Sequence, residues 1–530
     1  MNFTRREFIK TTGLGTLGFT IPILLPINDN KTKRPNIIFI MSDDHAEQAI
    51  SCYSKALINT PNIDRIANEG IMFKNSFVTN SICGPSRATM LTGKYSHKNG
   101  LRDNRDEFNG EQLTFTKLLQ NAGYKTHIVG KWHLKTNPTE FDSWQVLIDQ
   151  GEYYNPRFIE NGIEKKHIGY ATDIITDKAL EILKNADKEN PFCLLVHHKA
   201  PHRNWMPAAR HLGAFDNKDL PLPETFYDDY KNRIAAEQAD MRINNMYLGH
   251  DLKVKEGDYE IETGTGGNRK FAPDADKSWQ KTYEALTEEQ KRFWDAYYDP
   301  ISKKFKESKL QGNELSEWKY QRYMKDYLSC VLSIDENIGR ILDYLDKNNL
   351  ADDTIIIYTS DQGFYLGEHG WYDKRFMYEE SLGMPLVIRY PKEIKPNQVS
   401  EEMVLNLDFA PTFLDYAGVD VPEEIQGESF RTIAHGDTPK NWRNSVYYHY
   451  YEYPHGWHDV KQHYGIRTHR YKLIHFYNDI DVWEFYDLEK DPHEMNNLYN
   501  HPDYEKEIAE MTDELKKLQV RYGDLNPTEK

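Results

Sequence analysis

The thiol of Cys83 is the side chain of this chain best suited to covalent chemistry, and it opens a distinctive segment, residues 83–93. The Gly-Pro pair that follows it predicts a tight turn into a helix, since proline suits the first helical position, and Gly93 suits the end of that helix. The thiol is then expected beside free amides that favour anions, with Arg87 adding positive charge. A buried cysteine acting as a small hydrophobe is the ordinary alternative. It does not explain a proline, a serine and an arginine at fixed offsets.

Polar residues follow four of the strands that the sequence predicts. Because sites in open parallel sheets form beyond the carboxyl ends of strands, these endings are expected to meet. One such ending would mean little, since loops are polar, but four that supply carboxylates, lysines and histidines predict a shared site. The endings are residues 42–45 (Ser-Asp-Asp-His), 130–133 (Gly-Lys-Trp-His), 197–202 (His-His-Lys-Ala-Pro-His) and 360–363 (Ser-Asp-Gln-Gly).

Asp43, Asp44, Asp361 and Gln362 are all oxygen donors at these strand ends. Hard oxygen donors select Ca²⁺ or Mg²⁺ over zinc. An Asp-Asp pair taken alone is as well explained by a turn or a helix cap. Three carboxylates that converge without a cation would repel one another and raise one another's pKa, so a divalent ion is the simpler hypothesis.

The segment from Cys83 to Gly93 resembles the active-site signature of type I sulfatases, Cys-x-Pro-Ser-Arg-x-x-x-Leu-Thr-Gly. Residues 486–498 independently resemble a sequence near the end of many sulfatases. This resemblance implies the alkaline-phosphatase-like fold and the hydrolysis of sulfate monoesters on a carbohydrate. It also implies that Cys83 is oxidised after translation to formylglycine, an aldehyde, by a formylglycine-generating or anaerobic sulfatase-maturating enzyme.

The same resemblance assigns roles to the polar strand ends. Asp43, Asp44, Asp361 and Gln362 match the calcium ligands of the family, with modified Cys83 as a further ligand and Mg²⁺ less expected; many members have Asn where this chain has Gln362. Arg87 would hold the formylglycine hydrate, and Lys131 and Lys374 would contact sulfate oxygens. His133 would lie beside the hydrate, and His202 near the leaving oxygen.

The substrate is expected to be a sulfated polysaccharide or its oligosaccharides, because the chain resembles bacterial sulfatases of the N-acetylglucosamine-6-sulfatase type. An algal polysaccharide such as ulvan is an alternative substrate. Arg105, Arg203 and His455 are predicted to bind substrate, and Trp205 and His463 are further candidates for the mouth of the site. A phosphonate or phosphate monoester hydrolase of the same superfamily and a non-catalytic glycan-binding protein on the same fold are the alternative functions.

Strands and helices that alternate along the chain must position these residues. Apolar runs predict buried strands at 35–41, 126–129, 192–196, 354–358 and 385–388, and helical patterns lie at 113–121, 172–185 and 320–345. Such alternation predicts an α/β fold with a large, mainly parallel sheet sandwiched by helices.

The domain organisation follows from shifts in composition. Residues 1–30 are predicted to be an export signal and linker, and 31–421 the catalytic domain, with a charged helical insertion at about 206–318 that includes a flexible loop at 264–267. Residues 422–530 are predicted to form a smaller α+β subdomain, with antiparallel strands at 445–450, 464–467 and 471–474 and a final helix at 504–522.

Composition limits the partners and the compartment. The net charge of −17 argues against nucleic acid and against anionic membrane surfaces, so an anionic substrate needs locally concentrated positive charge. Arg5 and Arg6, followed by Phe, Ile and Lys, resemble a twin-arginine signal and predict a periplasmic or secreted protein. The apolar run after them is too short to span a bilayer, so no stable membrane span is expected.

Overall fold

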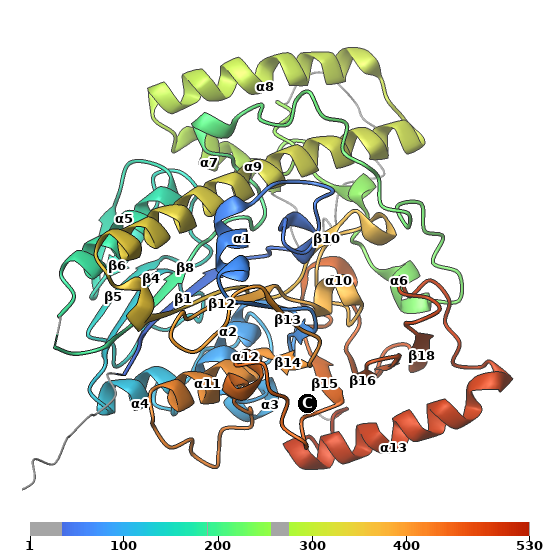
Figure 1. The fold of residues 1–530 in the computed structure, drawn as a ribbon. Coiled ribbons are helices and arrows are strands. Elements are labelled where there is room, and N and C mark those ends of the chain that lie inside the picture. The colour runs from blue at the N-terminus through green and yellow to red at the C-terminus, as the bar shows by residue number, and fades with distance from the viewer. Residues whose placement is uncertain (1–33, 188, 256–274, 529–530) are drawn as a thin grey trace, which may run out of the picture. The chain divides into compact units, whose positions relative to one another are not determined.

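Continuous apolar runs form the centre of a ten-stranded sheet in this computed structural model, which describes residues 34–187, 189–255 and 275–528 (Figure 1). The central strand β1 (Asn36–Ser42) is buried at every position. It pairs in parallel with β8 (Phe192–His197) and β9 (Thr354–Ser360). Strands that are covered on both faces have unbroken runs of apolar residues, which is why these three strands could be predicted from the sequence.

The sheet order is β13-β2-β12-β9-β1-β8-β4-β5-β6-β7. The run predicted at 385–388 is a strand, but it pairs antiparallel with β9, and β6 and β7 form an antiparallel hairpin at the other edge. The sheet is therefore mixed and mostly parallel, as an α/β fold predicts. The remaining strands are β2 (Ile71–Phe73), β4 (Lys125–Lys131), β5 (Ser143–Leu147), β6 (Arg157–Glu160), β7 (Ile163–Lys166), β12 (Leu386–Arg389) and β13 (Gln398–Ser400).

Helices cover both faces of this sheet because alternate side chains of β1 enter two different cores. Ile37 and Phe39 pack in one core, and Ile38 and Ile40 in the other. The first core includes helices α2 (Cys83–Thr92), α4 (Phe115–Asn121) and α11 (Phe409–Tyr416), and the second includes α1 (Pro61–Asn68), α5 (Ala171–Lys184) and α9 (Gly312–Lys347). The fold class predicted from the sequence is confirmed.

The C-terminal part forms a separate four-stranded antiparallel sheet with a helix against it. The order is β15-β16-β17-β18, so the three predicted strands are present and a fourth was missed. The elements are β15 (Ser445–Tyr450), β16 (His463–Thr468), β17 (Tyr471–Phe476), β18 (Val482–Asp487) and α13 (Glu505–Tyr522). The boundary at residue 421 stays a prediction.

The predicted insertion at 206–318 is helical mainly in its second half. It contains α6 (Ile234–Gln238), α7 (Ala275–Glu284), α8 (Glu288–Ser308) and the start of α9. The loop at 264–267 and the N-terminal segment with its arginine pair lie outside the described residues. Shorter elements are α3 (Ser96–Asn99), α10 (Glu379–Leu382), α12 (Arg431–Ala434), β3 (Ser76–Phe77), β10 (Tyr365–Leu366), β11 (Tyr372–Asp373) and β14 (Val404–Leu405).

Among the helices within the described ranges, none combines the length and the apolar character needed to cross a bilayer.

Candidate active site

The polar residues predicted at the ends of β1 and β9 meet, because these strands are adjacent, parallel and in register up to Ser42 and Ser360. The backbone N–H of Asp44 donates to Asp361 Oδ1 over 3.1 Å. One carboxylate oxygen each of Asp43, Asp44 and Asp361 lies within 4.8 Å of the other two, and all three side chains are fully buried. We call these three side chains the carboxylate cluster.

Cys83 lies at the first residue of α2 and is buried. The helix therefore begins two residues earlier than the proline suggested, while Gly93 ends it as predicted, with φ 64°. A ligand atom of Cys83 lies within 4.8 Å of one from Asp43 and one from His202. Burial raises the pKa of the thiol to about 12, against the opposing charges of Lys374 and Lys131. The helix N-terminus thus does not make this cysteine a thiolate, and the unmodified thiol is a poor nucleophile.

Arg87 projects from the first turns of α2 onto the carboxylate cluster. Its Nε and one terminal nitrogen donate to Asp361 Oδ2 over 2.9 and 2.8 Å. The other terminal nitrogen donates to the carbonyl of Lys131 over 2.9 Å. The guanidinium therefore ties the helix to the ends of β9 and β4.

Two buried lysines supply further positive charge. Lys131, at the end of β4, donates to Asp43 Oδ2 and to Gln150 Oε1. Lys374 donates to both carboxylate oxygens of Asp44, over 2.6 and 2.7 Å. With Arg87 they match the three carboxylates in formal charge, so positive charge is concentrated here on an acidic protein, as the sequence predicted.

The pKa values of the cluster diverge. Burial raises the pKa of Asp361 to about 7 and that of Asp44 to about 6, and in both cases the neighbouring charge of Asp43 adds to the shift. Burial also acts to raise the pKa of Asp43, but Lys131, His202 and Arg87 outweigh it and hold that pKa well below its ordinary value. The three basic side chains therefore hold Asp43 ionised, while burial and the charge of Asp43 make ionisation of Asp44 and Asp361 less favourable.

The donor atoms of the cluster fit a hard divalent cation. Asp43 Oδ1 is buried and finds no hydrogen-bond partner among the described residues. Gln362 donates its amide N–H groups to Asp44 and Asp361, which leaves its own Oε1 buried and without a partner in that same part of the chain. Asp43 Oδ1 lies 3.8 Å from Arg87. Carboxylate and amide oxygens that accept no hydrogen bond are the donors that Ca²⁺ or Mg²⁺ prefers.

His202 and His133 lie beside the cluster, and burial lowers the pKa of both rings. His202 Nδ1 lies 2.5 Å from the carbonyl of Arg203, so Nδ1 carries the proton, and Nε2 lies 3.8 Å from Asp44 Oδ2. His133 Nε2 lies 2.9 Å from Gln150 Nε2, so it accepts there. Its Nδ1 is buried with no partner in the described chain. In each ring, therefore, one nitrogen is engaged in a hydrogen bond and the other nitrogen is not.

Several residues around the cluster were not singled out from the sequence. Gln150 accepts from Lys131 and donates to His133, and no motif marked it. Tyr327, on α9, donates to the carbonyl of Asp44 over 2.7 Å. The ammonium group of Lys199 lies 4.9 Å from the ring centre of Tyr153, and its side chain is buried. Of these residues, only Lys199 could have been found from the sequence, since it belongs to the polar ending of a predicted strand, residues 197–202.

The predicted substrate contacts are more scattered. Among the described residues, neither exposed Arg105 nor exposed His455 makes a hydrogen bond or ion pair with the cluster; Arg105 pairs with Asp103 over 3.2 Å. Arg203 forms two hydrogen bonds with Asp251, over 2.7 and 2.8 Å. The positive charge of Arg203 is therefore largely neutralised by Asp251 inside the protein.

Two further candidates for the mouth were wrong. Trp205 is 0% exposed and packs against Tyr323, and His463 is also 0% exposed. The sequence suggested sugar stacking for these aromatic side chains, but tertiary packing places both inside the protein.

Comparison with known proteins agrees with this arrangement. The family model described as "Sulfatase" matches residues 35–419, and the model of the N-sulphoglucosamine sulphohydrolase C-terminal region matches residues 367–521. A curated N-acetylglucosamine-6-O-sulfatase of Bacteroides thetaiotaomicron is 53% identical over 510 residues, covering 94% of this chain and 89% of that protein. The human N-acetylglucosamine-6-sulfatase is 27% identical, covering 78% of this chain and 67% of that protein.

A solved structure, of a protein in complex with its substrate D-glucosamine-2-N,6-O-disulfate, superposes with a TM-score of 0.89. It is 52% identical and covers 94% of this chain and 100% of the other. The family model spans well over half of the chain, and the bacterial relative spans nearly all of it. The carboxylate cluster, the buried cysteine at the start of α2 and the basic residues around them therefore lie in a chain that belongs to the sulfatase family, enzymes that hydrolyse sulfate monoesters.

Proposed function

We propose that this sulfatase removes the 6-O-sulfate from glucosamine or N-acetylglucosamine residues of a sulfated glycan. The observation that carries this proposal is the solved relative at 52% identity in complex with D-glucosamine-2-N,6-O-disulfate. The name of the bacterial relative at 53% identity supports the same sulfate position.

The sulfatase family uses formylglycine and a divalent metal, and the residues of this chain suit both. Cys83, converted to formylglycine, would supply the oxygen nucleophile as the hydrated aldehyde, and a divalent ion would polarise that oxygen and the sulfate. Asp43, Asp44, Asp361 and Gln362 would hold the ion, and their exclusively oxygen donors favour Ca²⁺ over transition metals.

The remaining residues would bind the sulfate and move protons. Lys131 and Lys374 have buried ammonium groups beside Cys83 that would neutralise sulfate oxygens, while Arg87 keeps Asp361 in place. As the ester S–O bond breaks, the sugar oxygen takes up a proton. His202 Nε2 carries none in the neutral ring, so it would first take the proton of the attacking hydroxyl at position 83 and then give it to the sugar oxygen. His133 Nδ1, which carries the ring proton because Nε2 accepts from Gln150, would donate a hydrogen bond to the oxygen of the side chain at position 83.

The choice of substrate can be tested with monosaccharides that carry sulfate at one position. We expect release of sulfate from glucosamine 6-sulfate and N-acetylglucosamine 6-sulfate with kcat/KM at least about a hundredfold above that for the 3-O- and 2-N-sulfated isomers, since a misplaced sulfate misses the lysines. Ion chromatography of released sulfate measures this. Preference for another isomer, or for ulvan oligosaccharides, would contradict the proposed position.

The same assay separates the alternative functions. Faster hydrolysis of an aryl phosphate or phosphonate than of the matching aryl sulfate would favour the phosphonate or phosphate monoester hydrolase. Binding of sulfated sugar without turnover, in protein whose Cys83 is modified, would favour a glycan-binding protein.

Replacement of His202 by alanine is expected to slow sugar sulfates more than aryl sulfates. A sugar alkoxide is a poor leaving group and needs a proton, which is worth roughly 10²- to 10⁴-fold in rate, whereas a nitrophenolate leaves without one. The measurement is kcat for glucosamine 6-sulfate and for 4-nitrophenyl sulfate in His202→Ala and in the wild type. Equal losses on both substrates would mean that His202 does not act on the leaving oxygen.

The export route and the maturation partner complete the proposal. The arginine pair at residues 5 and 6 supports twin-arginine export to the periplasm or beyond. A formylglycine-generating or anaerobic sulfatase-maturating enzyme would oxidise Cys83 before the chain folds, because the folded structure buries this side chain.

A further inference from the structure

One loop of the C-terminal sheet reaches the segment that carries Lys374. It joins β15 to β16, and we call its middle part, residues 452–459, the rim loop. Glu452 forms an ion pair with Arg375, the residue that follows Lys374, and both side chains of this pair are buried. The catalytic proposal gives the rim loop no role.

His458 fixes the second half of the rim loop. Its Nδ1 donates to the carbonyl of Asp240 over 2.6 Å, and its own carbonyl accepts from the backbone N–H of Asp240 over 2.7 Å. Its Nε2 lies 3.2 Å from Asp373 Oδ2, and Asp373 directly precedes Lys374. These contacts hold the loop in one place, so Trp457, the neighbour of His458, is presented in a defined position.

Trp457 is the aromatic side chain that the rim loop leaves open. It is 36% exposed, and among the Phe, Tyr and Trp side chains of the described residues only Trp457 and Tyr227 are exposed. The guanidinium of Arg203, the residue after His202, lies 5.1 Å from the centre of the indole ring. Within the described chain, no second cation and no parallel ring stacks on the indole. Part of its surface is therefore free to contact a ligand.

The cation beneath the indole is already neutralised. Arg203 donates to both carboxylate oxygens of Asp251, over 2.7 and 2.8 Å. An exposed indole on a neutralised cation offers apolar surface rather than unmatched charge. Such a surface suits the C–H face of an uncharged pyranose ring better than it suits an anion.

The position of the indole indicates which sugar unit it meets. Cys83 and Lys374, which would act on the sulfate and bind it, are almost fully buried, whereas Trp457 is open to solvent. Trp457 contacts the residue after His202, and its neighbour His458 contacts the residue before Lys374. The sulfated unit must place its sulfate against the buried groups, so the exposed ring outside them faces the next sugar unit.

We propose that Trp457 is a stacking platform for the sugar unit linked to the sulfated one, so that the rim loop makes the enzyme favour oligosaccharides over the free sulfated monosaccharide. The identity of the sulfated unit rests on the proposed function. The inference goes beyond the glucosamine disulfate bound by the solved relative, because it names a second sugar position and the residue that forms it.

Disaccharides with an unsulfated N-acetylglucosamine linked on either side of N-acetylglucosamine 6-sulfate are the probes. We expect the wild type to cleave at least one of them with kcat/KM about tenfold or more above that for the monosaccharide, the factor that about 1.4 kcal/mol of stacking supplies. The gain should appear in KM, with kcat little changed, because the second sugar is held equally in the ground state and in the transition state.

Two replacements of Trp457 separate the ring from its bulk. Trp457→Leu keeps an apolar side chain over Arg203 but no flat ring, so it should raise KM for the preferred disaccharide about tenfold and change kcat/KM for the monosaccharide less than about twofold. Trp457→Phe keeps a ring and should stay within about threefold of the wild type on both substrates. If Trp457→Leu fails to fold, Trp457→Met, which also covers Arg203 without a ring, replaces it.

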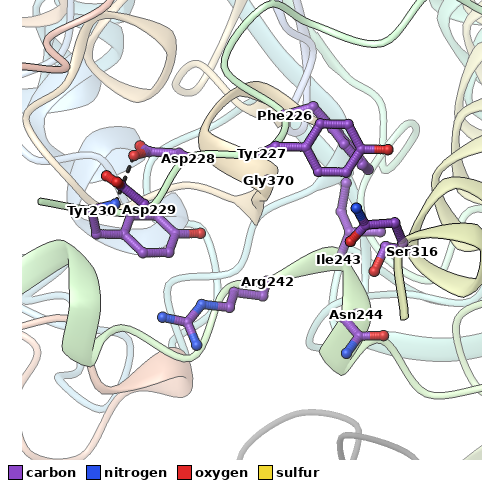
Figure 2. A pocket seen from close by; sticks show the side chains of 11 residues that line it. Phe226, Tyr227, Asp228, Asp229, Tyr230, Arg242, Ile243, Asn244, Ser316 and Gly370 are labelled. Carbon is purple, nitrogen blue, oxygen red and sulfur yellow. Dashed lines mark hydrogen bonds between the residues drawn. The ribbon is translucent and has the colours of Figure 1, made fainter. Parts of the chain in front are cut away.

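Tyr227→Leu is the matched control. Tyr227 is 54% exposed and lines a cavity of about 490 Å³ to which the rim loop contributes no residue (Figure 2). Removing this exposed ring should leave the preference for the disaccharide unchanged, because the ring lies outside the path of the substrate.

Three results would overturn the platform: no preference of the wild type for either disaccharide, equal KM values in Trp457→Phe and Trp457→Leu, or equal losses on both substrates in Trp457→Leu. If N-acetylglucosamine 6-sulfate is not cleaved at all, the proposed sulfate position fails instead. The same comparison is then made with the isomer that is cleaved, so the two failures are distinguishable.

Discussion

Cys83→Ala is expected to lower kcat/KM for sulfate release by roughly 10⁴-fold or more, since loss of a nucleophile removes the covalent route altogether. The structure sharpens this expectation, because burial keeps the unmodified thiol protonated, with a pKa of about 12. We therefore expect catalysis at position 83 to depend on conversion to the aldehyde, which intact-protein mass spectrometry detects as a loss of about 18 Da.

Cys193→Ala is the matched control for this experiment. Cys193 is a second fully buried cysteine, near the start of β8, and its replacement should cost some stability but leave turnover and the mass difference unchanged. Sulfate release at the wild-type rate by protein that retains its full complement of thiols would refute the assignment of Cys83.

Removal of the divalent ion by a chelator is expected to abolish turnover and to lower the melting temperature, and Ca²⁺ should restore both. An ion that binds only the folded protein stabilises it by about 2.7 kcal/mol at a hundredfold excess over its Kd. Asp361→Asn removes one acid of the cluster and should abolish the calcium-dependent shift. The measurement is thermal unfolding with and without added Ca²⁺.

Asp335→Asn is the matched control. This buried carboxylate accepts from the backbone N–H groups of Asn62 and Ile63 at the start of α1, so its loss should lower stability while the response to Ca²⁺ persists. A calcium response that survives in Asp361→Asn would place the ion elsewhere.

The ion-free protein should also show a distinctive pH dependence. An aspartate in an unfolded chain titrates near pH 3.9, as model peptides do, but burial raises the pKa of Asp44 to about 6 and that of Asp361 to about 7. Between about pH 4 and pH 7 the folded state then binds more protons than the unfolded state, so these two groups lower stability as the pH rises through that window. In Asp361→Asn, the free energy of unfolding should fall less steeply between about pH 4 and pH 7, because the contribution of Asp361 is lost. A pH dependence identical to that of the wild type would contradict the raised pKa of Asp361.

The structure corrected the sequence-based predictions where the location of a side chain, or the direction of a strand, could not be inferred from residue type. Trp205 and His463 looked suited to sugar binding, yet both are wholly buried. The strand at 385–388 was located, but its antiparallel direction depends on the path of the chain, which hydrophobicity does not encode. Gln150, which links Lys131 to His133, stands in a loop without any motif and became visible only through its contacts.

The sequence by itself determined the family, and it predicted the edge of the sheet at which chemistry would occur. Unbroken apolar runs can only be buried strands or buried helix segments, and the polar residues that end parallel strands must meet at one edge. Only the tertiary structure decided which charges pair there, which oxygens of Asp43 and Gln362 accept no hydrogen bond from the described residues, and that burial raises the pKa of the Cys83 thiol. Those properties arise from the distances and the dielectric surroundings of groups far apart in the chain, and spacing along a sequence measures neither.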